Sequence, residues 1–221
     1  MLTDILLILH IVVFGAWFGT DLATFHLSRK VLDATTPVAT RATLAKVMLG
    51  VEVIARLCLP ATLVLGVSLS IRLGYLDLPD WVVWPVLAVG VAWVAVVWTI
   101  HRAGGTGGAS VALTTFDLAF RSIVCIAVLM AGVATVASGD PFTVMWLGIK
   151  LLAFGTIMAI GIRVRFLLRP FSAAFGDLVA NGSSPDREDA VAVALRRAHP
   201  YVLGIWAMLL LAVVMAVIQP V

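Results

Sequence analysis

The chain has 221 residues, of which 62% are hydrophobic and 12% are charged. Soluble domains carry about 25% charged residues, so this composition excludes a soluble globular protein and a disordered one. It predicts a polytopic membrane protein with a single transmembrane domain over residues 1–221, with lipid as a partner. The net charge of +3 comes from basic loops, and no nucleic-acid partner is expected.

The first hydrophobic run predicts a transmembrane helix over about 4–26. Polar side chains inside lipid are costly and usually face the interior of a bundle. At 3.6 residues per turn, one stripe of this helix carries an imidazole, two aromatic rings, a carboxylate and a hydroxyl: His10, Phe14, Trp17, Asp21 and Thr24. We therefore expect this stripe to face the protein core and to carry the function.

Further hydrophobic runs complete a predicted all-α bundle of six transmembrane helices, with spans over about 54–73, 81–101, 119–138, 142–166 and 200–218. Of the 15 Lys and Arg residues, 13 flank the first, third and fifth connections. The positive-inside rule places these connections in the cytoplasm, so both termini are expected outside. A proline start predicts a cytoplasmic amphipathic helix over about 185–198, and the glycine-rich run 104–108 is interpreted as a cytoplasmic linker.

The middle of the chain resembles a tandem repeat of one hairpin. An arginine, a proline and a tryptophan recur, the last two of them 62 residues further on: Arg56, Pro79 and Trp84, then Arg121, Pro141 and Trp146. Spans two and three would then repeat as spans four and five in the same orientation. In this register Lys150 aligns with Ala88, so only the second hairpin carries a buried cation.

Two polar residues are expected at similar depth in the outer half of the membrane. Lys150 lies roughly 12 Å into span five at 1.5 Å per residue, and His10 enters span one from the same side. Imidazole ligates haem iron, and a neutral lysine amine can do so as well. Trp17, Trp84 and Trp146 would supply flat apolar walls for a porphyrin. In the structural alternative, His10 donates to a helix carbonyl and Lys150 snorkels outward along Trp146.

The other ionisable groups are interpreted from their depth. Asp21 is expected to pair with Arg56 or Arg121, and a proton-relay step is its functional alternative. Arg72 can snorkel at the outer end of span two, and it is also a candidate cofactor contact. Three histidines near the cytoplasmic ends of spans one, three and six could bind copper, zinc or a second haem, or could be ordinary interfacial residues: His26, His101 and His199.

Three segments resemble known membrane proteins. The run from Leu9 to Gly19, which contains His10 and Trp17, resembles the first helix of the HemJ family and of the related copper-resistance D (CopD) type proteins. The run that starts at Trp146 is similar to the lysine-bearing helix of HemJ, and the run around Arg56 and Pro60 resembles its second helix. HemJ has four helices, so the extra hairpin and sixth span bring this chain nearer to the broader CopD-like group.

HemJ proteins are haem-b membrane proteins assigned to protoporphyrinogen oxidation, with the first-helix histidine and the later lysine as key residues. The resemblance implies haem b, with its iron on His10 and with Lys150 as second ligand or as a cation facing the substrate or propionates. The further candidate cofactor contacts are three aromatic residues and an arginine already named: Phe14, Trp17, Trp146 and Arg72.

We therefore expect a haem-b redox protein that passes electrons from a lipophilic donor, protoporphyrinogen or quinol, to the respiratory chain. Lys150 and Asp21 are its catalytic candidates. The alternatives are copper or small-solute transport of the CopD type, and a structural accessory subunit of a membrane complex. The seven methionines do not cluster, which disfavours copper. A homo-oligomer or a larger membrane complex is also expected.

Overall fold

The computed structural model describes residues 1–104 and 108–220, and the regular secondary structure of these residues is helical, with no strand. Six helices are long and apolar enough to cross a membrane: α1 (Leu2–Val31), α2 (Val38–Arg72), α3 (Val83–Arg102, preceded by the short helix η1, Asp80–Val82), α4 (Gly108–Ser138), α5 (Met145–Leu167) and α8 (His199–Ile218). The chain is therefore an all-α, multi-pass membrane protein. The predicted linker falls largely on residues 105–107, outside the described residues.

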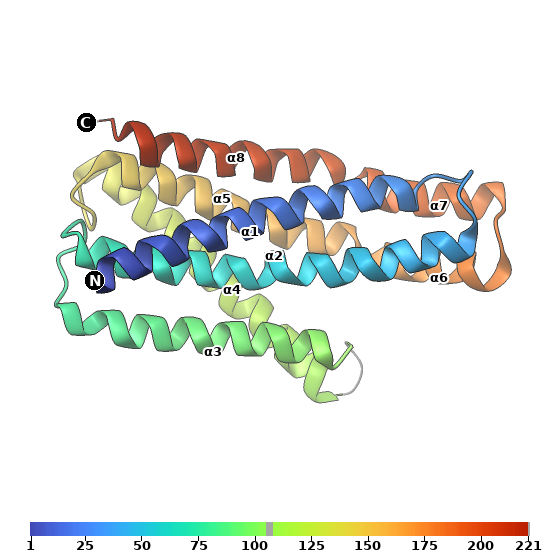
Figure 1. Ribbon diagram of the computed structural model, residues 1–221, viewed down its shortest axis with the longest axis horizontal. Coiled ribbons are helices and arrows are strands. Elements are labelled where there is room, and N and C mark those ends of the chain that lie inside the picture. Colours follow the sequence, from blue (N-terminus) through green and yellow to red (C-terminus); the bar gives the residue numbers. More distant parts are fainter. Residues whose placement is uncertain (105–107, 221) are drawn as a thin grey trace.

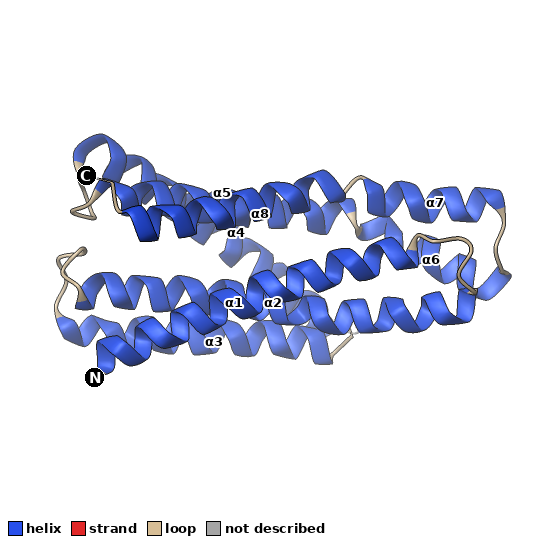
Figure 2. Ribbon diagram, turned by 45° about the horizontal axis from the view of Figure 1, so that its top comes forward, coloured by secondary structure: helices blue, strands red, loops and turns tan. Residues whose placement is uncertain are grey.

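The six spans form two layers of three helices. Helix α2 packs on both α1 and α3, and α5 packs on both α4 and α8. Figure 2 shows α1, α2 and α3 in one layer and α5, α8 and α4 in the other. Both termini lie at one end of the bundle (Figure 1), as an even number of spans requires. We call this end the outer end, because the basic connections lie at the opposite, inner end.

At the inner end several helices extend beyond the predicted spans. Helix α2 begins at Val38 rather than near residue 54, and α4 begins at Gly108 rather than near residue 119. The 35 residues of α2 would measure about 52 Å at 1.5 Å per residue, against roughly 30 Å of hydrocarbon. Two short helices lie there as well (Figure 1): α6 (Arg169–Asn181), which was not predicted, and α7 (Pro185–Arg196), at the position predicted for the surface helix.

An apolar cluster and one ion pair dock α6 and α7 onto α1 and α2. The cluster contains Val31, Ala45, Met48, Phe171, Phe175, Leu178, Val191, Ala194 and Leu195. Arg41 of α2 is only 1% exposed and donates from Nε to the Val31 carbonyl at 2.8 Å. Its two other nitrogens donate to the Glu188 carboxylate of α7 at 2.7 and 2.8 Å. Arg41 therefore ties α7 and the end of α1 to α2.

The internal repeat is visible in the packing, but its register is 65 residues rather than 62. Three features recur with this shift: the glycine–aliphatic contacts Gly90–Val64 and Gly155–Leu129, the ion pairs Glu52–Arg56 and Asp117–Arg121, and the positive-φ glycines Gly74 and Gly139. The predicted alignment of Lys150 with Ala88 is therefore wrong. It matched Trp84 to Trp146, whereas the packing register matches Trp81 to Trp146. Lys150 corresponds to Pro85 instead.

Candidate functional site

The predicted polar stripe of α1 faces the interior of the bundle. Trp17 is 3% exposed and joins a central core to which every span contributes. The other members of the stripe, from His10 to Thr24, are partly buried, whereas Ile11 and Val12 between them are exposed toward lipid. The periodicity argument thus identified the inward face of α1 correctly.

His10 and Lys150 line one cavity, which lies in the outer half of the bundle. We call it the outer cavity; it has a volume of about 210 Å³ and is bounded by α1, α2, α5 and α8. Its other lining residues are mostly apolar and include Leu7, Leu63, Gly66, Val67, Trp146, Leu147, Leu151 and Phe154. Two polar residues that are 140 positions apart in the sequence therefore line the same apolar cavity.

The imidazole of His10 has a nitrogen without a partner. Its Nδ1 atom is buried and makes no hydrogen bond among the described residues. The ring lies against α2, where a Cβ on Gly66 would stand 3.3 Å from Cε1 of His10. The Thr62 hydroxyl, which also lines the cavity, is likewise buried without a partner. Buried polar groups are normally hydrogen-bonded, so these two atoms are positions where a ligand could bind.

Lys150 comes from α5, in the other layer of helices. It forms no ion pair within the described part of the chain and is partly buried. Trp146, one turn before it, is buried and meets Tyr75 edge to face, with ring centroids 5.5 Å apart. Since both Trp146 and Lys150 line the outer cavity, α5 contributes an aromatic wall and an amine to the same site.

Three other residues expected near the porphyrin lie elsewhere. Arg72 pairs with Asp80 and does not line the outer cavity, since its position at the end of α2 directs it to the loop before α3. Phe14 stacks on Phe18, with ring centroids 6.5 Å apart, and lines neither cavity. Trp84 is 62% exposed. Of the predicted aromatic walls, Trp146 alone lines the outer cavity.

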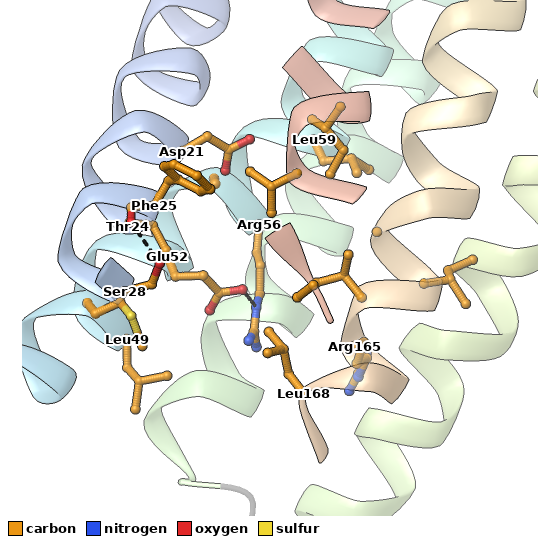
Figure 3. Close-up of a pocket in the computed structure, with 18 of the residues that line it drawn as sticks. Asp21, Thr24, Phe25, Ser28, Leu49, Glu52, Arg56, Leu59, Arg165 and Leu168 are labelled. Carbon is orange, nitrogen blue, oxygen red and sulfur yellow. Dashed lines mark hydrogen bonds and ion pairs between the residues drawn. The ribbon is translucent and has the colours of Figure 1, made fainter. Parts of the chain in front are cut away.

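A second, inner cavity of about 360 Å³ lies toward the basic end of the bundle (Figure 3). Trp17 lines its deep end, and Asp21, Glu52 and Arg56 line one side. Trp17 meets Phe154 edge to face, with ring centroids 5.9 Å apart. Because Trp17 lines only the inner cavity and Phe154 only the outer one, these two rings separate the cavities.

The predicted ion pair of Asp21 with Arg56 or Arg121 is wrong. Arg56 donates to Glu52 at 2.5 Å, and Arg121 donates to Asp117 at 3.2 Å. Each arginine has an acid one turn earlier on its own helix, the spacing at which helical side chains meet. Figure 3 shows the Arg56 guanidinium beside Glu52 and directed away from Asp21. Asp21 forms no ion pair among the residues that the structure describes.

Asp117, which the sequence reasoning did not identify, organises the other wall of the inner cavity. It is almost fully buried in α4 and accepts hydrogen bonds from Trp93 Nε1 at 3.0 Å and Arg165 Nη1 at 3.2 Å, in addition to the bond from Arg121. The Arg121 guanidinium also lies 5.6 Å from the Trp93 ring centroid. The signal that could have found Asp117 is its 65-residue spacing from Glu52.

The three inner histidines do not form a metal site. His26 and His101 are exposed, and His101 lies beside the Trp98 ring. His199 instead contacts Ser28, with 3.2 Å between Nε2 and Oγ. Within residues 1–104 and 108–220, no three His, Cys, Asp or Glu side chains gather as a metal ion would require. Of the two interpretations, the structure favours ordinary interfacial residues, because similar depth on different helices does not bring side chains together.

No protein-family model matches the chain, and no curated protein or solved structure matches it either. Function is therefore inferred from the two cavities and from the side chains that line them.

Proposed function

We propose that the protein binds haem b at the outer cavity and passes electrons from a lipophilic donor, protoporphyrinogen or quinol, to the respiratory chain of a bacterial inner membrane. The observation that carries this proposal is the presence of His10 and Lys150 in one apolar cavity, with His10 Nδ1 buried and without a partner. The resemblance of both helices to HemJ points to the same two residues. When bound, haem supplies one-electron redox chemistry.

The residues of the outer cavity suit this role. The Nδ1 atom of His10 would hold the haem iron, because this atom makes no hydrogen bond among the described residues that would have to be broken first. Lys150 supplies a second ligand or a cation from the facing layer. Gly66 leaves room for the imidazole ring, since any side chain there would press on it. The mostly apolar lining matches the apolar faces of a porphyrin.

Binding requires the two layers to part. Pockets for drug-sized molecules measure roughly 300–1,000 Å³, whereas the outer cavity has about 210 Å³. Helix α1 packs extensively on α2, and α5 on α8, but α1 touches α8 only lightly. The seam between these helix pairs is therefore the place where a flat ligand would enter with the least loss of packing.

Absorbance spectroscopy of the detergent-purified protein tests the proposal. We expect a Soret band and a reduced α-band in the wild type, and the loss of both in His10→Ala. The matched control is His26→Ala, which removes an exposed histidine of the same helix and should leave the spectrum unchanged. Full haem occupancy with an unchanged spectrum in His10→Ala would show that the assignment is wrong.

Lys150→Met tests the second half of the site. A lysine in hydrocarbon costs about 2.5–3.5 kcal/mol on insertion scales, so a bundle retains one where something offsets that cost. We expect the substitution to leave insertion intact but to change the haem spectrum, potential or activity. Ile149→Met is the control, because Ile149 is the neighbouring residue and lines neither cavity. If Lys150→Met matches the wild type in all three measurements, His10 acts without Lys150.

A further inference from the structure

One wall of the inner cavity carries more guanidinium groups than carboxylates. Asp117 accepts hydrogen bonds from both Arg121 and Arg165, so one carboxylate faces two guanidinium groups in the interior, and the exposed Arg169 lines the cavity at its mouth. Glu52, on the other side, is engaged by Arg56. Positive charge inside a protein is costly without a counter-charge. The wall formed by α4, α5 and α6 is therefore electrostatically suited to an anion.

Arg165 is the guanidinium best placed to contact such an anion. Its side chain is 31% exposed, and among the described residues it donates one hydrogen bond, although a guanidinium has five N–H groups. Figure 3 shows Arg165 of α5 and Arg56 of α2 on different sides of the cavity, with Leu168 near them. The planar fork of an arginine matches the oxygens of a carboxylate or a phosphate.

The deeper part of the inner cavity is apolar. Trp17, Leu59, Val97, Ile157 and Ile205 line it. Gly161 of α5 also lines it, and a Cβ built there would meet no atom within 4 Å, so this side of the helix faces open space. The cavity thus combines a basic mouth at the inner end of the bundle with an apolar interior.

We propose that the inner cavity binds an amphipathic monoanion, a molecule with one carboxylate or phosphate group on an apolar body, with its oxyanion at Arg165. Asp21 restricts the ligand to a single acid group. It lines one side of the cavity and forms no ion pair among the described residues. It supplies no positive charge, so a second anionic group on the body would be buried beside it without a counter-charge. A fatty acid and a phospholipid of the inner leaflet share this chemistry. The proposal does not depend on haem binding in the outer cavity.

Native mass spectrometry of the full-length protein in a neutral detergent tests this proposal. The probes are palmitate, phosphatidylglycerol, the neutral amphiphile monoolein and inorganic phosphate. We expect one palmitate or phosphatidylglycerol per chain, and no retained monoolein or inorganic phosphate. Preference for palmitate identifies a fatty carboxylate as the ligand, and preference for phosphatidylglycerol identifies a lipid phosphate. Retention of monoolein to the same extent would overturn the proposal.

Two variants locate the site. Arg165→Gln should weaken binding about tenfold or more, as expected for the loss of a charge-assisted hydrogen bond, and Asp117 keeps Arg121 and Trp93 as partners. Gly161→Leu should block the apolar part, since its Cβ would point into open space. Arg102→Gln is the control, since Arg102 is an exposed basic residue at the same end of the bundle that lines neither cavity. Wild-type binding by either test variant would refute this site.

A dianionic probe tests the role of Asp21. Hexadecanedioate should bind more weakly than palmitate to the wild-type protein, and Asp21→Asn should reduce the difference. Equal affinities for the two probes in the wild type would refute the restriction to one acid group.

Discussion

Removal of the Glu188 carboxylate should undock α7 from the bundle. In Glu188→Ala, the Arg41 guanidinium stays behind at 1% exposure with no counter-charge. Breaking a buried ion pair in this way costs about 3–5 kcal/mol. The reverse substitution, Arg41→Met, should cost only about 1–3 kcal/mol, because Glu188 is 19% exposed and keeps its hydrogen bond from Ser183 at 2.7 Å. Glu188→Ala should therefore cost more than Arg41→Met, because Arg41 is far more buried than Glu188.

Hydrogen exchange measures this effect where it occurs. A loss of about 3 kcal/mol corresponds to more than a hundredfold loss of protection, and we expect it in the amides of α7. The buried thiols of Cys58 and Cys125 lie in the central core, so they should stay unreactive toward a thiol-specific dye while α7 opens. Replacing both partners, Arg41→Met with Glu188→Leu, should restore much of the protection. The reasoning is refuted if Arg41→Met exposes α7 as much as Glu188→Ala does.

Gly155→Ala should lower the free energy of unfolding by about 1–3 kcal/mol, because the added Cβ would lie 2.6 Å from the Leu129 side chain. Gly161→Ala on the same helix meets open space and should be neutral or stabilising, so equal effects in thermal denaturation would contradict the close packing at Gly155. A reporter fused after Val221 should report the outer side of the membrane, and a reporter inserted at Gly105 should report the cytoplasm. Both positions lie outside the described residues. A cytoplasmic signal after Val221 would contradict the predicted orientation.

Hydropathy and helical periodicity predicted the parts of the fold that depend on local sequence. The six spans follow from long apolar runs, and the inward stripe of α1 follows from a spacing of 3.6 residues. The shared cavity of His10 and Lys150 follows from counting residues from the same side of the membrane, because the rise per residue is fixed. These inferences needed no knowledge of which helices are neighbours.

The features that the sequence reasoning missed depend on helix neighbours or lie outside the lipid. Hydropathy detects only the part of a helix within hydrocarbon, so the first turns of α2 and α4 and the whole of α6 were missed. Asp117 lies two residues before the predicted start of span four, so the search for polar residues inside the spans did not include it. Its partners Trp93 and Arg165 come from two other helices, and no local pattern connects them.

Each hairpin of the 65-residue repeat can act as its own insertion unit during synthesis. Residues 52–102 and 117–167 run in the same direction, and each begins with an acid–arginine pair at the basic end and turns at a positive-φ glycine at the other. Gain or loss of a whole hairpin therefore preserves the orientation of every later span, whereas loss of one helix would invert the rest. Each hairpin thus has its own basic end, to which the positive-inside rule applies separately.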